Sequence, residues 1–323
     1  MIYTNVTRMK SFFILGFPGL SPQYYGPVSA LLFSLYLSIA IGNFFILAFV
    51  FCEKSLQKPT YLVFCHLALN DLTFGTLTLP KIISKYWFGD SFISFHACFS
   101  QMFFVHYLGS VTSFMLLVMA LDRFIAICIP LRYPVLITNN TISVLCGVAW
   151  FIPLPLMVGV VLHALTLPYC KSNIIAQCYC DHISITSQAC GKDVIVVQVT
   201  CLCMAMFCLL LPLAFIMCSY ITIIVIIMKM SNAAGRKKTL STCTPQIFIT
   251  CLFYLPRCFV YVANTVGFSF SFDVRILLIL LYSLFPAAVN PIIYCFKTQD
   301  IKQTLLKKLK TTKIRVEIKI SVI

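Results

Sequence analysis

The chain has 323 residues, of which 60% are hydrophobic and 10% are charged, and its mean hydropathy is +0.96. Soluble globular proteins have about 45–50% apolar and about 25% charged residues. This chain therefore has too little polar surface to cover a soluble particle. The same numbers exclude intrinsic disorder, collagen, a coiled coil and a small disulfide-rich secreted domain, and they favour an integral membrane protein.

The net charge of +15 does not indicate a nucleic-acid groove, because the Lys and Arg residues are spread over loops and the C-terminal tail. Between these charges lie apolar stretches of about 20 residues or more, the length that a spanning helix needs. They are continuous, whereas a β-barrel would show alternating segments of about ten residues. We predict an all-α integral membrane protein, a seven-transmembrane helix bundle. The expected spans are 27–51, 59–84, 97–128, 142–164, 194–228, 239–267 and 274–296.

The orientation follows from the distribution of basic residues, which are enriched in cytoplasmic loops of membrane proteins. With the N-terminus outside, most Lys and Arg lie on the inner side, and the sequon at Asn5 lies in the outer tail. We expect an extracellular tail (1–26), the bundle (27–296) and a basic cytoplasmic tail (297–323). Lysines alternate with leucines in that last segment, which favours a short amphipathic C-terminal helix on the inner leaflet over a solvated basic tail.

Polar residues inside spans are costly and are usually functional. Asp71 lies in the middle of the second span, the pair Asp122-Arg123 closes the third, and Asn290-Pro291 lies near the inner end of the seventh. With these residues the chain resembles the rhodopsin-like G-protein-coupled receptors. The other matching positions are Gly42, Asn43, Cys98, Trp150 and Tyr220.

The resemblance is sharper to the odorant receptors, whose signature is similar to residues 119–134, MALDRFIAICIPLRYP. Phe124 and Ile129 within this run, and Gln246 further on, depart from the residues that are usual there. Segments 101–106 and 167–173 look like the class I, fish-type branch. Other matching segments are 59–61, 238–243, 253–254 and 286–294.

The resemblance implies a two-state activation switch at the inner side. Arg123 would pair with Asp122 when the helices are closed and would contact a partner when they open. The alternative is that these polar residues only specify helix packing. The expected switch residues are Asp71, Asp122, Arg123, Tyr220, Asn290, Pro291 and Tyr294.

The long outer loop contains four cysteines and faces an oxidising compartment, where disulfides persist. Their spacing alone allows several connectivities. The resemblance implies that Cys98 pairs with Cys180 and Cys170 with Cys190, which leaves Cys178 free. A metal site that includes Cys178, Cys180 and His182 is the less favoured alternative, because disulfides would consume its ligands. We expect neither a metal nor a cofactor.

We expect the ligand site between helices in the outer third of the bilayer. Small and polar residues recur at helical spacing along the third span, and Arg257 in the sixth could bind a carboxylate through its planar fork. Our hypothesis is that Arg257, His106 and Tyr261 bind an anionic or polar head while apolar residues enclose the rest of the ligand. The expected ligand-binding residues are Gln101, Phe104, Val105, His106, Gly109, Ser110, Met204, Tyr254, Arg257, Tyr261 and Leu280.

Two simpler interpretations of the charged and imidazole groups stay open. His106 could have a purely structural role, as a hydrogen-bond partner of a neighbouring helix. Arg257 could extend toward the outer headgroups or pair with Asp181 or Asp273.

An enzyme is not indicated, since the sequence has no HExxH, no GxSxG and no Gly-rich phosphate loop. A retinal pump would need a Lys in the seventh span, and this span contains none. A transporter would show internal repeats, and the sequence shows none. We predict an odorant receptor of the plasma membrane, in the cilia of olfactory sensory neurons, that acts on a stimulatory heterotrimeric G protein and raises cyclic AMP. The alternatives are a non-olfactory rhodopsin-like receptor for another small molecule and a non-signalling membrane protein.

Overall fold

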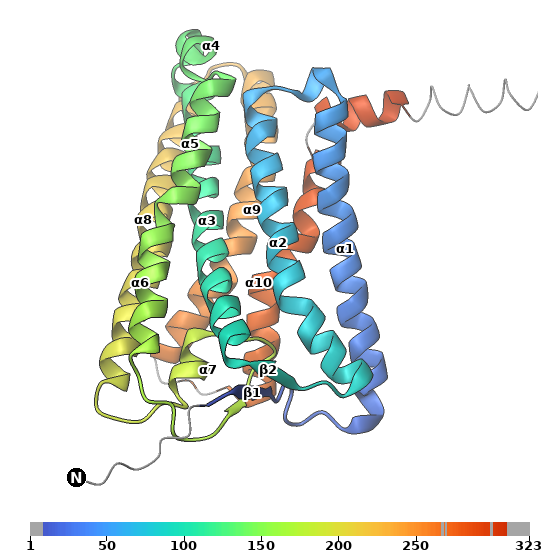
Figure 1. The fold of residues 1–323 in the computed structure, drawn as a ribbon. Coiled ribbons are helices and arrows are strands. Elements are labelled where there is room, and N and C mark those ends of the chain that lie inside the picture. The colour runs from blue at the N-terminus through green and yellow to red at the C-terminus, as the bar shows by residue number, and fades with distance from the viewer. Residues whose placement is uncertain (1–8, 266–267, 269, 298–299, 309–323) are drawn as a thin grey trace, which may run out of the picture.

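The computed structural model describes residues 9–265, 268, 270–297 and 300–308. Within them seven helical spans are long and apolar enough to cross a membrane, and they lie side by side as an elongated bundle (Figure 1). This confirms the predicted seven-helix architecture. The spans are α1 (Tyr25–Cys52), α2 (Pro59–Phe88), α3 (Phe95–Cys128), α5 (Asn139–Phe151) with α6 (Pro153–Leu165), α8 (Val194–Lys229), α9 (Ala233–Thr265) and α10 (Phe272–Lys297).

Local sequence signals set several helix ends. Pro59 begins α2, where its missing N–H costs no helical hydrogen bond, and Gly89 ends it with φ 76°, the left-handed conformation that glycine adopts readily. The side chain of Ser94 accepts a hydrogen bond from the backbone N–H of Ala97 and so caps α3. Pro153 divides the fourth span into two helices, because proline lacks the N–H that would continue the ladder.

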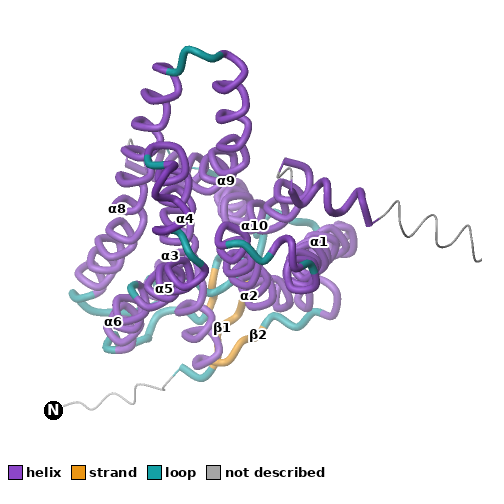
Figure 2. The backbone as a smooth tube through the Cα atoms, turned by 90° about the horizontal axis from the view of Figure 1, so that it is seen from above, coloured by secondary structure: helices purple, strands orange, loops and turns teal. Residues whose placement is uncertain are grey.

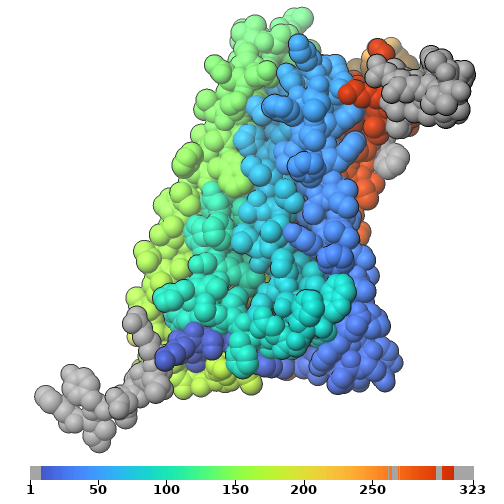
Figure 3. All heavy atoms as spheres, turned by 45° about the vertical axis from the view of Figure 1, so that its right-hand side comes forward, coloured from blue at the N-terminus to red at the C-terminus, as the bar shows by residue number. Residues whose placement is uncertain are grey.

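The outer end of the bundle, defined here as the end that carries the disulfides, is covered by a small sheet. Its order is β2-β1-β3, formed by β1 (Ser11–Ile14), β2 (Phe92–Ser94) and β3 (Ile174–Ile175). The β1 strand pairs antiparallel with β2 and parallel with β3. Phe12 and Ile14 are fully buried, and this N-terminal segment lies against the start of α3 and the outer loop (Figure 3). The sequence did not predict this strand.

Short helices complete the outer loop and the turns. The outer loop contains α7 (His182–Thr186), and α4 (Tyr133–Leu136) follows α3 at the inner end. Seen along the bundle axis, the helices surround a common centre, and the turn between α8 and α9 extends away from the others (Figure 2). The 3-10 turns are η1 (Pro22–Tyr24), η2 (Lys54–Leu56) and η3 (Pro130–Arg132).

A short helix turns away from the bundle axis at the inner end, over residues 300–308 (Figure 1). Its Ile301 is fully buried, whereas Lys302 and Lys308 are exposed, so the helix is amphipathic as predicted. Asp300 forms an ion pair with Lys58 at 2.8 Å, and Lys308 pairs with Glu53. These contacts attach the helix to the turn between α1 and α2. The sequon Asn5 and the remainder of the basic tail lie outside the described residues.

Candidate ligand cavity and activation switch

A cavity of about 210 Å³ lies in the outer half of the bundle. Residues of α3, α8, α9 and α10 surround it, and α7 of the outer loop contributes to its wall. Pockets between helices of this kind hold small ligands in helix bundles.

One face of α3 lines this cavity. The face contains Val105, His106, Gly109, Ser110 and Ser113. These residues follow one another at the spacing of neighbours on a single helix face. A Cβ on Gly109 would meet no atom within 4 Å, so this position leaves open space. The structure therefore brings four of the predicted α3 residues, Val105, His106, Gly109 and Ser110, to one cavity.

Arg257 of α9 lines the same cavity, so it faces the bundle interior. Its Nη1 donates a hydrogen bond of 2.8 Å to the carbonyl oxygen of Phe253. Its guanidinium carbon lies 3.8 Å from the centre of the Phe253 ring and 4.9 Å from that of Tyr282. Both rings thus contact the guanidinium, whose planar fork has the geometry to pair with a bidentate anion. Asp273, one of the alternative partners for Arg257, instead accepts hydrogen bonds from the backbone N–H of Gly19.

The outer loop supplies polar groups that the sequence did not assign to the pocket. Asp181 and His182 line the cavity together with Arg275, at the start of α10. The backbone N–H of His182 donates to Nε2 of His106 at 3.4 Å, which ties the loop to α3. Burial lowers the pKa of His182 to about 3, so its imidazole is neutral at pH 7. Burial raises the pKa of Asp181, and the charge of Arg275 opposes that shift.

Four of the predicted ligand-binding residues do not line the cavity. Phe104 falls on the opposite side of α3 and is 36% exposed on the bundle exterior. Leu280 is buried in the packing between α10 and its neighbours, and Met204 packs against the inner hydrophobic core. Tyr254 is also buried there, and its hydroxyl lies 2.6 Å from that of Ser113, so it supports the cavity wall from behind. The side chain of Tyr261 lies outside the described residues.

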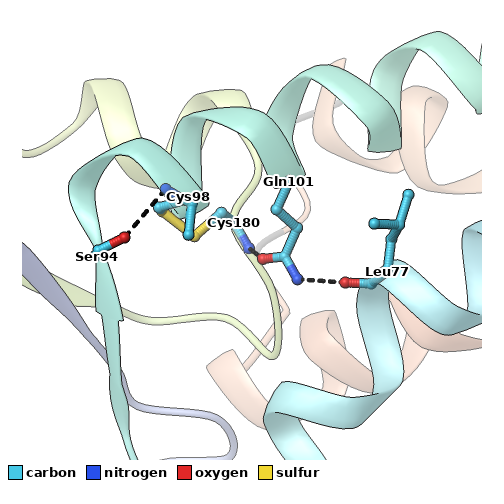
Figure 4. The surroundings of a disulfide bond; sticks show 6 residues. Leu77, Ser94, Cys98, Gln101 and Cys180 are labelled. Atoms are coloured by element: carbon cyan, nitrogen blue, oxygen red, sulfur yellow. Dashed lines mark hydrogen bonds between the residues drawn. A yellow bond between two sulfur atoms is a disulfide. The ribbon is translucent and has the colours of Figure 1, made fainter.

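Gln101 does not line the cavity either, and its side-chain amide connects the outer loop to α2 (Figure 4). Its Oε1 accepts from the backbone N–H of Cys180 at 2.8 Å, and its Nε2 donates to the carbonyl oxygen of Leu77 at 2.7 Å. Both groups are therefore used within the protein. Gln101 links α3 to the outer loop and to α2, close to the helix proline Pro80.

Both disulfides that the resemblance implied are present, Cys98–Cys180 and Cys170–Cys190. Cys178 is a free, buried thiol, and burial raises its pKa to about 12. Among the described residues no group of three or more His, Cys, Asp or Glu side chains could hold a metal ion. Cys180 is covalently paired and so cannot serve the alternative metal site.

At the inner end, side chains from three elements converge on Asp122. Arg123 forms an ion pair with it at 3.1 Å. The hydroxyl of Tyr133 donates to Asp122 at 2.9 Å, and that of Thr60 donates at 3.2 Å. Arg123 also donates to Thr60 at 3.2 Å. Asp122 is 1% exposed, so these partners provide the compensation that a buried carboxylate needs.

The Gln246 amide of α9 lies beside the same pair. In the amide orientation that satisfies both of its groups, it donates to the carbonyl oxygen of Met119 and accepts from Nε of Arg123, each at 3.2 Å. It thereby joins α9 to the inner end of α3, so outward movement of α9 would break this contact.

The other residues predicted to form the switch lie in the bundle between the cavity and the inner end. Asn290 donates a hydrogen bond of 2.7 Å to Asp71, and both side chains are buried. Tyr294 is fully buried and stacks on Phe64, with ring centres 4.2 Å apart. Pro291 lies within α10 between Asn290 and Tyr294, and Tyr220 of α8 is buried in the inner core.

Sequence reasoning missed Arg275, Tyr282 and Ser283 as cavity residues. Together with Ile279 they form one face of α10, at i, i+4, i+7 and i+8. That helical spacing is the signal by which they could have been found.

The structure combines seven spanning helices with a cavity in the outer half and an acid–arginine pair at the inner end. This combination defines a G-protein-coupled receptor with rhodopsin-like organisation. The family model described as olfactory receptor matches residues 32–312. The chain therefore belongs to the olfactory receptor family, whose members are signalling receptors and not enzymes.

Human members of this family match the chain over nearly their full length. The chain is 36% identical to olfactory receptor 52N5 of Homo sapiens over 308 residues, 92% of each chain. It is 34% identical to human olfactory receptor 51E2 over 308 residues, with 93% of each chain covered, and 33% identical to human olfactory receptor 2AT4 over 303 residues, with 94% covered.

Proposed function

We propose that this receptor binds a small carboxylate in the outer cavity and responds by activating a stimulatory G protein, which raises cyclic AMP. The observation that carries the ligand class is the position of Arg257, whose guanidinium borders the cavity between two aromatic rings. Arg stays charged in any protein environment, and its fork pairs with both oxygens of a carboxylate.

The charges of the lining support an anion. Counted as formal charges, Arg257 and Arg275 contribute two positive charges and Asp181 one negative charge, so the described lining has a formal surplus of one positive charge. A monoanionic ligand would balance it. Because an uncompensated charge is costly in an enclosed site, the same surplus disfavours a cationic ligand.

The inner end supports coupling to a G protein. A cavity of about 250 Å³ opens there, lined by Arg123, Thr60, Gln246 and residues of the α9 start. Opening of α9 would break the Gln246 contact, release Arg123 and widen this cavity for a partner helix. The location in olfactory cilia and the class I branch stay predictions from the sequence.

The test is a cyclic AMP reporter in cells that express the receptor with a stimulatory olfactory-type G protein. Straight-chain carboxylates, alcohols, amines and amino acids form the ligand panel. Arg257→Leu should raise the half-maximal concentration for carboxylates by about 100-fold, because charge-assisted hydrogen bonds contribute about 1.5–3 kcal/mol. Arg123→Ala should abolish the response while the receptor stays at the surface.

Arg257→Lys is the matched control, since it keeps the charge and loses the fork; we expect an intermediate loss. An unchanged carboxylate response of Arg257→Leu would disprove the anion site. A response that persists in Arg123→Ala would disprove the signalling route.

A further inference from the structure

Three polar atoms at the outer-loop wall of the cavity have no hydrogen-bond partner in the described protein. They are Oδ1 of Asp181 and both ring nitrogens, Nδ1 and Nε2, of His182. His182 is 1% exposed, and both residues line the cavity. Buried polar groups are almost always paired, because leaving one unpaired costs free energy. Because both residues line the cavity, a ligand with polar groups can supply the missing partners there.

The chemistry of these atoms restricts what the partner can be. A carboxylate oxygen only accepts hydrogen bonds, whereas a neutral imidazole has one nitrogen that donates and one that accepts. A hydroxyl group can donate to Asp181 and accept from the N–H of His182 at the same time. An ammonium group can only donate, so it would pair with Asp181 and with the acceptor nitrogen of His182 but not with the imidazole N–H. Each group thus satisfies two of the three atoms.

The charge balance favours a hydroxyl over an ammonium. A monoanion already compensates the single surplus positive charge of the described lining. A hydroxyl adds no charge, whereas an ammonium on the ligand would cancel that compensation. The second polar group of the ligand should therefore be neutral.

We propose that the ligand is a small hydroxy acid, whose carboxylate binds Arg257 and whose hydroxyl bridges Asp181 and His182. This inference rests on the proposed carboxylate receptor and adds a second recognition site at the outer-loop wall. The carboxylate determines binding to α9, and the hydroxyl determines which acids bind well.

The size of the cavity agrees with such a ligand. The cavity of about 210 Å³ has room for a small organic acid. Larger odorants would require the cavity to widen.

The experiment compares matched ligands on the full-length receptor at the cell surface. Butanoate and hexanoate are each tested against their 2-, 3- and 4-hydroxy derivatives in the cyclic AMP assay, and 4-aminobutanoate is the ammonium probe. We expect the best hydroxy isomer to act at a concentration at least tenfold below that of the unsubstituted acid. The readout is this ratio, which is measured within one variant and so does not depend on its expression level.

Two substitutions should reduce the ratio to about one. His182→Phe replaces the imidazole by an aromatic ring without nitrogens, and Asp181→Ala removes the carboxylate. Asp193→Ala is the matched control, because Asp193 is an exposed acid of the same loop that does not line the cavity. It should keep the full preference.

The possible results separate this inference from the proposed function. Equal potency of plain and hydroxy acids, or a preference that survives both substitutions, overturns the hydroxyl site and leaves the carboxylate receptor standing. Stronger action of 4-aminobutanoate also overturns it. If no acid activates a wild-type receptor that is present at the surface, the proposed function fails, and the hydroxyl site fails with it.

Discussion

The two ends of the bundle are stabilised in different ways. The outer end is connected by two disulfides and by a sheet whose strands come from residues 11–14, 92–94 and 174–175. At the inner end, hydrogen bonds and one ion pair converge on Asp122. Covalent and backbone pairings fix the outer end as a frame for the cavity, whereas the side-chain pairings of the inner end can exchange. The proposed function requires this asymmetry, because the proposed ligand site must keep its shape while the proposed partner site opens.

Substitutions at the two ends should therefore have different consequences. Substitutions in the outer frame should remove folded receptor from the surface. Substitutions in the inner network should keep the receptor and change its basal or stimulated signal.

The largest effect is expected from Cys98→Ser. The disulfide with Cys180 spans 82 residues, and the loss of such a closure destabilises a protein by about 4–5 kcal/mol. Surface labelling of intact cells should show almost no receptor. Cys178→Ser is the control, because this thiol is free, and it should leave surface labelling close to wild type. Normal surface levels of Cys98→Ser would contradict the role of the outer end as a fixed frame.

Gln101→Leu should have the next largest effect. It leaves the buried N–H of Cys180 without its partner, which costs about 2–3 kcal/mol. We expect the thermal midpoint of the purified receptor to fall by several degrees. The control is Gln57→Leu, since the exposed side chain of Gln57 donates to the Phe51 carbonyl at the inner end, away from the outer loop. Equal midpoints for the two variants would show that Gln101 does not connect the outer loop to α3.

How much the sequence reveals differs between the two ends. The polar residues of the inner end occur in contiguous motifs. Asp122-Arg123 and Asn290-Pro291 could therefore be identified from their positions within the apolar spans. The seven spans were also predicted, because hydropathy over about 20 residues is a local property. The end of the second span differs from the prediction by a few residues, because α2 continues to Phe88 and ends at Gly89.

The outer end could not be predicted in the same way, because its contacts join distant segments. Nothing in residues 11–14 indicates that they pair with residues 92–94 and 174–175. The cavity was predicted in part: helical spacing located Val105 and His106, but Phe104 was misplaced because a residue adjacent in sequence lies about 100° away around the helix. Arg275 was not among the predicted ligand-binding residues, although it lines the cavity.

Gly16→Ala tests the N-terminal segment of the frame. Gly16 has φ 64°, and a Cβ there would overlap the hydroxyl of Tyr86, which accepts a hydrogen bond from the Phe17 N–H at 2.8 Å. Gly89→Ala is a matched control with φ 76° and open space around the position. The left-handed backbone should destabilise both variants by about 1 kcal/mol, and the overlap should add about 1–3 kcal/mol to Gly16→Ala alone. Identical thermal midpoints would show that the N-terminal segment is not tightly packed on α2.

Tyr133→Phe should have the smallest effect on stability but a distinct effect on signalling. It removes the 2.9 Å hydrogen bond to Asp122, which holds the closed inner network together. A loss of about 1 kcal/mol from the closed state shifts the equilibrium toward the open state about fivefold. Basal cyclic AMP without ligand should therefore rise several-fold at an unchanged surface level, whereas Tyr24→Phe, an exposed residue of the outer end, should leave it unchanged. A fall in surface level without any rise in basal signal would mean that the inner network is also a fixed frame, and the contrast between the two ends would be lost.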